Sequence, residues 1–86
     1  MKETSEIEIS FEEDSTHTEA RASIVLRGAT FTGWGRARRN PIDTNVPMIG
    51  EELATARALS DLAHKLVDAA AEAISGREGQ PARLQG

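Results

Sequence analysis

Hydrophobic and polar residues alternate strictly near the start of the chain. In residues 6–12, the side chains of Ile7, Ile9 and Phe11 alternate with glutamates and a serine. This period of two is typical of a β-strand that buries one face and exposes the other. Turn-forming residues follow at 13–17, so the pattern predicts a first strand and then a reversal of the chain.

Two further strands are predicted by the same alternation on either side of a glycine turn. Residues 18–28 place small and aliphatic side chains at every second position, and residues 30–38 do the same. A turn at Gly28-Ala29, with a positive φ at the glycine, would close this hairpin. It sets an expected register with three core-side pairs: Leu26 with Phe31, Ile24 with Gly33 and Ala22 with Gly35.

Gly33 and Gly35 fall on the face of the third strand that the pattern buries. Because they carry no side chain, their simplest role is to let a helix cross the sheet closely. Trp34 lies between them in the sequence and therefore projects from the opposite face. It would be exposed to solvent there unless a partner covers it.

A long amphipathic helix is predicted for residues 49–75. Apolar residues recur there at three- and four-residue spacing, namely Ile49, Leu53, Ala56, Leu59, Leu62, Ala63, Leu66, Ala70 and Ile74. Pro47 is expected to open a helical turn, and Gly76 is the expected C-cap. Residues 1–76 are thus predicted to form one domain, and residues 77–86 a polar C-terminal tail.

The predicted fold class is α+β, a three-stranded antiparallel meander followed by one long helix packed on one sheet face. The expected core joins large apolar residues of both parts, with Ile7, Ile9, Phe11, Ile24, Leu26 and Phe31 against Leu53, Leu59, Leu62, Leu66 and Ile74.

Composition narrows the setting and the chemistry of this fold. The chain has 86 residues, 38% of them hydrophobic, which suits one small domain with a modest stability margin. It has no cysteine, so disulfides, zinc–thiolate sites and cysteine nucleophiles are excluded, and a reducing cytoplasm is the expected location. No apolar run is long enough for a signal peptide or a membrane span, so no membrane association is expected.

Candidate catalytic and metal-binding residues are few. The two histidines, His17 and His64, are far apart in sequence, and the acidic residues 12–14 lack the glycine and the terminal glutamate of a calcium loop. No serine or threonine has a recognisable base and orienting group near it in the pattern. The chain is therefore predicted not to be an enzyme, and no cofactor and no metal site is expected.

The outer face of the sheet carries the candidate interaction surface. Its expected members are Trp34, Arg36, Arg38, Arg21 and Val25. Arginines beside a tryptophan can stack bases and hold phosphates, so one interpretation is an atypical nucleic-acid-binding protein. Glutamates of the same face would partly neutralise the arginines in cross-strand pairs, and the net charge of -4 disfavours nucleic acid. The leading interpretation is therefore a non-enzymatic interaction module with an unknown protein partner.

Self-association is expected for this module. The third strand is predicted to be a free edge without an acidic guard, while the glutamates of the first strand oppose edge-to-edge pairing. A homodimer could form by pairing two third strands or by stacking two outer faces, and either arrangement would bury Trp34.

The spans GWGRARRNP and ELATARALSDLAH resemble a short actinobacterial family, a domain of unknown function with a double-stranded-RNA-binding-domain-like fold. The resemblance covers nearly the whole chain and implies the β-β-β-α fold without implying an activity. His17 is similar to a histidine in the first hairpin loop of the RNA-binding domains. Those domains carry lysines at the start of the last helix, where this chain has Glu51 and Glu52, so RNA binding in the usual mode is disfavoured.

Overall fold

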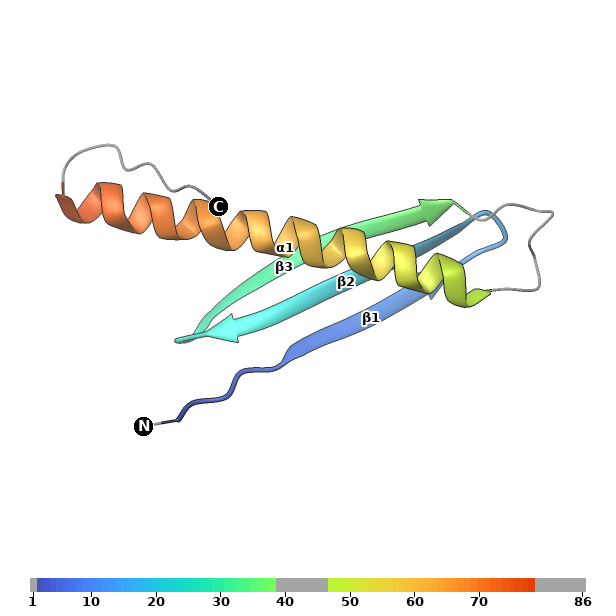
Figure 1. The fold of residues 1–86 in the computed structure, drawn as a ribbon, viewed down its shortest axis with the longest axis horizontal. Coiled ribbons are helices and arrows are strands. Elements are labelled where there is room, and N and C mark those ends of the chain that lie inside the picture. Colours follow the sequence, from blue (N-terminus) through green and yellow to red (C-terminus); the bar gives the residue numbers. More distant parts are fainter. Residues whose placement is uncertain (1, 39–46, 79–86) are drawn as a thin grey trace.

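A computed structural model describes residues 2–38 and 47–78 of the chain. Its three strands form one antiparallel sheet in the order β1-β2-β3, with β1 at Ile7–Glu13, β2 at His17–Leu26 and β3 at Ala29–Arg38. One helix, α1 (Pro47–Glu78), crosses a single face of this sheet (Figure 1). The predicted β-β-β-α order and the α+β class are confirmed.

The turn between β1 and β2 is held by one carboxylate. Asp14 Oδ1 accepts hydrogen bonds from the backbone N–H of Thr16 at 2.7 Å, from that of His17 at 2.7 Å and from Thr16 Oγ1 at 3.0 Å. These donors hold the pKa of Asp14 below its ordinary value, the Thr16 amide most of all. The ionised carboxylate thereby replaces backbone hydrogen bonds that the tight reversal cannot form.

The turn between β2 and β3 lies one residue earlier than expected. Arg27 and Gly28 have φ values of 51° and 81°, the two successive positive values of a type I′ hairpin turn. The predicted turn at Gly28-Ala29 is therefore wrong, and the register differs by two residues. The observed core-side pairs are Ile24 with Phe31, Ala22 with Gly33 and Ala20 with Gly35.

An even shift of register leaves every side chain on its predicted face, because side chains alternate with a period of two. It does change the rows beneath the helix. The observed register aligns Ala22 with Gly33 and Ala20 with Gly35, so the smallest residues of two strands lie side by side. They form a shallow track along which a helix can lie.

Gly33 and Gly35 bring α1 into direct contact with β3, as the sequence predicts. A Cβ atom added at Gly33 would overlap the carbonyl oxygen of Ala58, and one added at Gly35 would overlap that of Ala54. The helix backbone therefore occupies the space that side chains would fill on an ordinary strand. At the start of the helix, a Cβ atom added at Gly50 would meet the side chain of the buried Thr18.

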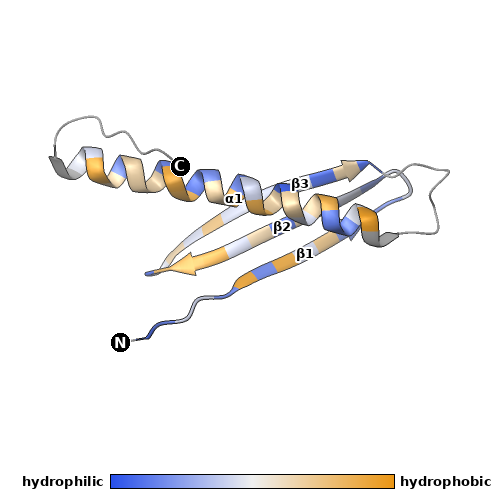
Figure 2. Cartoon of the chain, in the orientation of Figure 1, coloured by the Kyte–Doolittle hydropathy of each residue, from blue (hydrophilic) through white to orange (hydrophobic). Residues whose placement is uncertain are grey.

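The buried core consists mainly of small residues, and five of the eleven large residues expected in the core belong to it or pack against it. Its buried members are Ala20, Ala22, Ala37, Ala54, Ala58 and Leu62, with Ile9, Ile24, Phe31 and Leu66 partly buried against them. The expected core residues Ile7, Phe11, Leu26, Leu53 and Leu59 are instead 37–46% exposed. Figure 2 shows the hydrophobic positions of β1 lying mostly beside the helix, which covers β2 and β3.

The face of α1 that meets the sheet is rotated from the predicted one. Residues at four-residue intervals face the sheet, from Gly50 through Ala54, Ala58 and Leu62 to Leu66. Several residues of the predicted stripe therefore lie outside the contact, namely Ile49, Leu53, Ala56, Leu59, Ala63 and Ala70. Close packing of the helix on the sheet requires small side chains at the contact, whereas the hydrophobic pattern of the sequence emphasises the large ones.

The helix begins at Pro47, as expected, and continues past Gly76 to Glu78. Gly28 is the one glycine with a positive φ among the described residues, so Gly76 does not form the left-handed C-cap that was predicted. Residues 77 and 78 of the expected tail are helical, and the rest of that tail lies outside the described residues. The C-terminal part of α1 extends past the end of the sheet (Figure 1).

Replacing Gly35 by alanine is expected to destabilise the protein by about 3 kcal/mol, because the new Cβ overlaps the helix backbone rather than a movable side chain. Gly76→Ala is the matched control. Nothing lies within 4 Å of its added Cβ, and alanine in a helix interior stabilises by about 0.5–1 kcal/mol. Urea unfolding measures both, and equal effects of the two substitutions would contradict close packing at Gly35.

Leucine truncations test the observed core. Leu62 is 2% exposed, so Leu62→Ala should cost about 2–5 kcal/mol of unfolding free energy. Leu59 is 37% exposed, so Leu59→Ala should cost clearly less. Thermal or urea unfolding compares the pair, and a larger loss at Leu59 would show that the helix faces the sheet differently.

Candidate interaction surface

The sheet face opposite the helix carries the predicted surface residues. Strand alternation places Trp34, Arg36, Arg38, Arg21 and Val25 all on this outer face, between the positions that the helix buries. Trp34 is 50% exposed and Val25 is 58% exposed. The structure thus places the five residues on one surface. Arg21 and Val25 lie on β2, whereas Trp34, Arg36 and Arg38 lie on β3.

One cross-strand row organises the middle of this outer face. Ser10, Arg21 and Trp34 lie side by side on β1, β2 and β3. The guanidinium carbon of Arg21 lies 5.7 Å from the centre of the Trp34 ring, within the range of a cation–π contact. Such a contact contributes about 0.5–1 kcal/mol at an exposed site and restricts the orientation of the indole.

The next row carries charges of both signs. Glu12 lies opposite Glu19 on β2, and Glu19 lies opposite Arg36 on β3. The sequence predicts cross-strand ion pairs here. Within residues 2–38 and 47–78, however, the one salt bridge is on the helix, between Lys65 Nζ and Asp61 Oδ2 at 3.0 Å. The carboxylates and guanidinium groups of the outer face therefore remain available to a partner.

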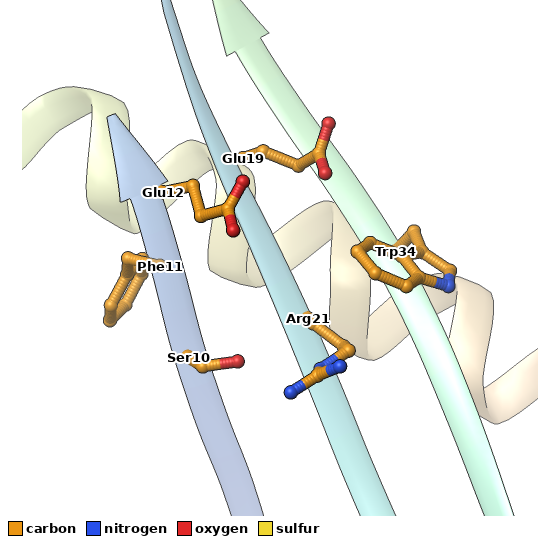
Figure 3. A pocket seen from close by; sticks show the side chains of 6 residues that line it. All are labelled: Ser10, Phe11, Glu12, Glu19, Arg21 and Trp34. Atoms are coloured by element: carbon orange, nitrogen blue, oxygen red, sulfur yellow. The ribbon is translucent and has the colours of Figure 1, made fainter. Parts of the chain in front are cut away.

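A shallow hollow lies between these two rows. It has a volume of about 180 Å³ and is lined by Ser10, Phe11, Glu12, Glu19, Arg21 and Trp34 (Figure 3). Glu12, Glu19, Arg21 and Trp34 stand on the face turned to the viewer, with the helix behind the sheet. Small-molecule sites are mostly enclosed cavities of about 300–1,000 Å³, so this hollow suits a partner's side chain better than a cofactor.

The part of the chain that the structure describes contains no group of three or more histidine, aspartate or glutamate side chains placed to hold a metal ion. His17 instead lies with its Nδ1 2.8 Å from Thr16 Oγ1, beside the first turn. No helix among the described residues is long and apolar enough to cross a membrane.

The outer edge of β3 is not free, which corrects the expectation of an open third strand. Three side chains of α1 reach it and bond its outward backbone groups, with Lys65 Nζ donating to Thr32 O at 2.8 Å, Trp34 N donating to Asp61 Oδ2 at 2.9 Å and Arg57 Nη1 donating to Arg36 O at 2.6 Å. Backbone groups bonded in this way cannot pair with another strand. Dimerisation by pairing two β3 edges is therefore disfavoured.

Arg57, Asp61 and Lys65 cap the edge of β3, a structural role that the sequence pattern did not predict. Their four-residue spacing places them in a row along one side of the helix. The Trp34 amide, and after it the Lys65 ammonium, hold the pKa of Asp61 below its ordinary value. The row of alternating charge beside a small-residue stripe is the signal that could have indicated an edge cap.

Comparison with known proteins identifies the family. The sequence model described as Rv2632c-like matches residues 3–83, and the chain belongs to this family. The uncharacterized protein Mb1767 of Mycobacterium bovis is 44% identical over 78 residues, which are 91% of this chain and 83% of that protein. The uncharacterized protein Rv2632c of Mycobacterium tuberculosis is 41% identical over 78 residues, or 91% of this chain and 84% of that protein.

A solved structure supports the fold. The crystal structure of Rv2632c superposes with a TM-score of 0.84 at 40% sequence identity, covering 94% of this chain and 96% of the solved one. The predicted membership of an actinobacterial family of unknown function is thereby confirmed.

Protonation of Asp61 should weaken the folded state. Because its pKa is lower in the folded chain than in the unfolded chain, the ionised form favours folding. This contribution is complete above the unfolded value of about 3.9 and is lost as the pH falls through the lower folded value. Asp61→Asn should therefore be less stable than the wild type at neutral pH, and the difference should shrink in acid.

Urea unfolding over a range of pH measures this difference. Asp68→Asn on the same helix is the control, because Asp68 makes no hydrogen bond or ion pair with another described residue. A stability difference at Asp61 that stays constant down to about pH 2, below the usual range of aspartate pKa values, would contradict the proposed role of its charge.

Proposed function

We propose that this member of the Rv2632c-like family is a small, non-enzymatic interaction module of the cytoplasm that self-associates through its outer sheet face. The observation that carries the proposal is Trp34, which is 50% exposed and is oriented by Arg21 on a face with charges of both signs. Aromatic and arginine side chains are enriched where protein interfaces gain most of their binding energy. A chain without cysteine also suits a reducing compartment.

The outer face is complementary to itself under two-fold symmetry. If a second copy stacks on it with the axis along the strands, β1 of each copy lies over β3 of the other. Glu12 of one copy then faces Arg36 of the other, and Ser10 faces Trp34, because each pair shares a cross-strand row. Two Glu12–Arg36 pairs and two buried indoles would result.

The size of the face indicates weak association. Three strands about 4.8 Å apart and about 25 Å long present roughly 400 Å² per copy. Specific interfaces that bury less than about 1,200 Å² in total are at the low end of the range and are often transient. The dimer is therefore expected to form at micromolar rather than nanomolar concentrations.

The setting of the charged groups supports binding rather than catalysis. General acid–base catalysis uses groups with shifted pKa values in a site that excludes water. Among the described residues, the two carboxyl groups with a lowered pKa, Asp14 and Asp61, are instead bonded to backbone amides, where they stabilise a turn and a strand edge. Their charges have structural partners, and the outer face is open to solvent.

Nucleic-acid binding through the arginine-bearing face is the competing function. Arg21, Arg36 and Arg38 beside Trp34 form the combination that holds phosphates and stacks bases. Glu12 and Glu19 lie in the same cross-strand row as Arg36, however, and would repel a phosphate backbone at close range. The likeness to double-stranded-RNA-binding domains stays a prediction, and nucleic acid is one outcome of the test below.

Self-association is tested by light scattering or sedimentation at about 100 μM protein, where mass action favours a weak dimer. Arg36→Glu and Glu12→Arg should each reduce the measured mass towards that of the monomer, because like charges would then face each other. The double variant that swaps the two charges should restore the dimer. Trp34→Ala should weaken it, and Trp34→Phe should weaken it less.

Three results would contradict this proposal. The wild type could have a monomer mass at that concentration, or the charge swap could fail to restore what the single variants lose. Alternatively, Trp34 fluorescence could change on adding RNA or DNA at low salt, with the change lost in Arg21→Ala and Arg36→Ala. That last result would support the nucleic-acid function instead.

A further inference from the structure

The two edges of the sheet are treated differently by the fold. The outward backbone groups of β3 belong to Thr32, Trp34 and Arg36, and α1 bonds them. Because hydrogen-bonded and non-hydrogen-bonded pairs alternate across the sheet, the backbone N–H and C=O groups of Ile7, Ile9 and Phe11 on β1 point outward, away from β2. Among the described residues, no side chain bonds these groups, so β1 is an open edge.

The side chains of the same β1 residues form an apolar strip on the helix side of the sheet. Ile7 is 46% exposed and Phe11 is 43% exposed, while Ile9 between them is half-buried. The helix covers β2 and β3 and leaves most of this strip uncovered (Figures 1 and 2). An open edge and an uncovered apolar strip therefore belong to one strand.

The helix places one large apolar side chain, that of Leu59, on the β1 side of the sheet. Leu59 follows Arg57 by two residues and therefore points about 200° away from it around the helix axis. Arg57 reaches the outer edge of β3, so Leu59 faces the β1 side of the sheet. It is 37% exposed.

The charges around β1 select the kind of strand that can bind there. Glu6, Glu8 and Glu12 are all exposed, and none forms an ion pair with another described residue. Pairing β1 with β1 of a second copy would bring these carboxylates together, and like charges on adjacent strands destabilise a sheet. A strand that carries lysine or arginine on its polar face would meet them favourably.

We propose that β1 accepts a fourth strand from another protein, an extended segment in which apolar and basic residues alternate. Its backbone would bond the outward groups of Ile7, Ile9 and Phe11. Its apolar side chains would cover the strip beside Leu59, and its basic side chains would lie next to Glu6, Glu8 and Glu12. This mode of recognition takes affinity from the backbone and specificity from alternate side chains.

This second surface is distinct from the self-association surface on the outer face, and Glu12 is the one residue that both proposals use. The strip lies on the helix side and at one edge of the sheet, whereas Trp34 projects from the opposite face of β3. The two proposals therefore fail separately. Trp34→Ala should leave strand binding at β1 unchanged.

The direct test uses a peptide of alternating valine and lysine as long as β1. NMR titration of the full chain should show chemical-shift changes centred on β1. Amide hydrogen exchange at Ile7, Ile9 and Phe11 should slow by at least about tenfold at saturation, because these amides would become hydrogen-bonded. Exchange at Glu8, which already pairs with β2, should change less.

Three further peptides separate strand addition from simple charge attraction. A peptide with the same composition but with its valines and lysines in separate blocks should bind at least about tenfold more weakly, because its side chains cannot alternate. A valine–glutamate peptide should not bind measurably. N-methylation of every second residue should abolish binding in one of the two possible patterns, since only alternate amides face β1.

Charge variants test the role of the glutamates. The double variant Glu6→Gln and Glu8→Gln should weaken the valine–lysine peptide by roughly three- to tenfold, as expected for two exposed ion pairs. Glu52→Gln with Glu72→Gln is the matched control, because it removes the same net charge from exposed helix positions. The control should change the affinity by less than about twofold.

Four results would overturn the inference. The blocked peptide could bind as well as the alternating one, or both N-methylated patterns could bind equally. The matched control could lose as much affinity as the β1 variant. Finally, the amides of Ile7, Ile9 and Phe11 could become protected at high protein concentration without peptide, which would show that a second copy occupies the edge.

Discussion

The contact between the backbone of α1 and the two glycines of β3 governs the rest of the structure. Gly33 and Gly35 leave no room for a Cβ atom, so the helix lies against the strand itself. Small residues are needed on both sides of such a contact. The core is therefore built mainly of alanines, with Ala20 and Ala22 on the sheet and Ala54 and Ala58 on the helix. The same closeness lets charged side chains on one flank of the helix reach the backbone of the strand beneath.

This asymmetric position of the helix gives the sheet three different surfaces. The β3 edge is closed by side chains of α1, so the amide of Trp34 is bonded while its indole stays exposed on the outer face. The β1 edge lies beyond the reach of the helix and keeps both its outward backbone groups and its apolar side chains exposed. A domain with one blocked edge can add strands at the other edge without polymerising through both.

Strand positions and strand faces could be predicted from the sequence, because a period of two is readable without knowing which strands pair. The register could not, since turns at Arg27-Gly28 and Gly28-Ala29 both suit the residues and differ by an even shift. The core was predicted only in part. Leu62 is buried as expected, but the hydrophobic pattern of the helix also indicated Leu53, which is exposed because the glycines decide which face of the helix packs on the sheet. The edge cap was missed because a charged helix face looks the same whether it meets water or a strand.

The large apolar residues that contribute least to the stability of the isolated chain are the ones that a binding partner could cover. Burial of apolar area stabilises by about 25 cal/mol per Å². A core made mostly of alanine buries little apolar area per residue and therefore contributes little to the free energy of folding. The large apolar groups Ile7, Phe11 and Trp34 remain partly exposed and withhold that contribution from the monomer. A partner that covers them stabilises the folded state by an amount that rises with the logarithm of its concentration relative to its Kd. For a domain this small, binding and folding stability are therefore coupled. The same exposed side chains lower the stability of the monomer and would provide the contact area for a partner.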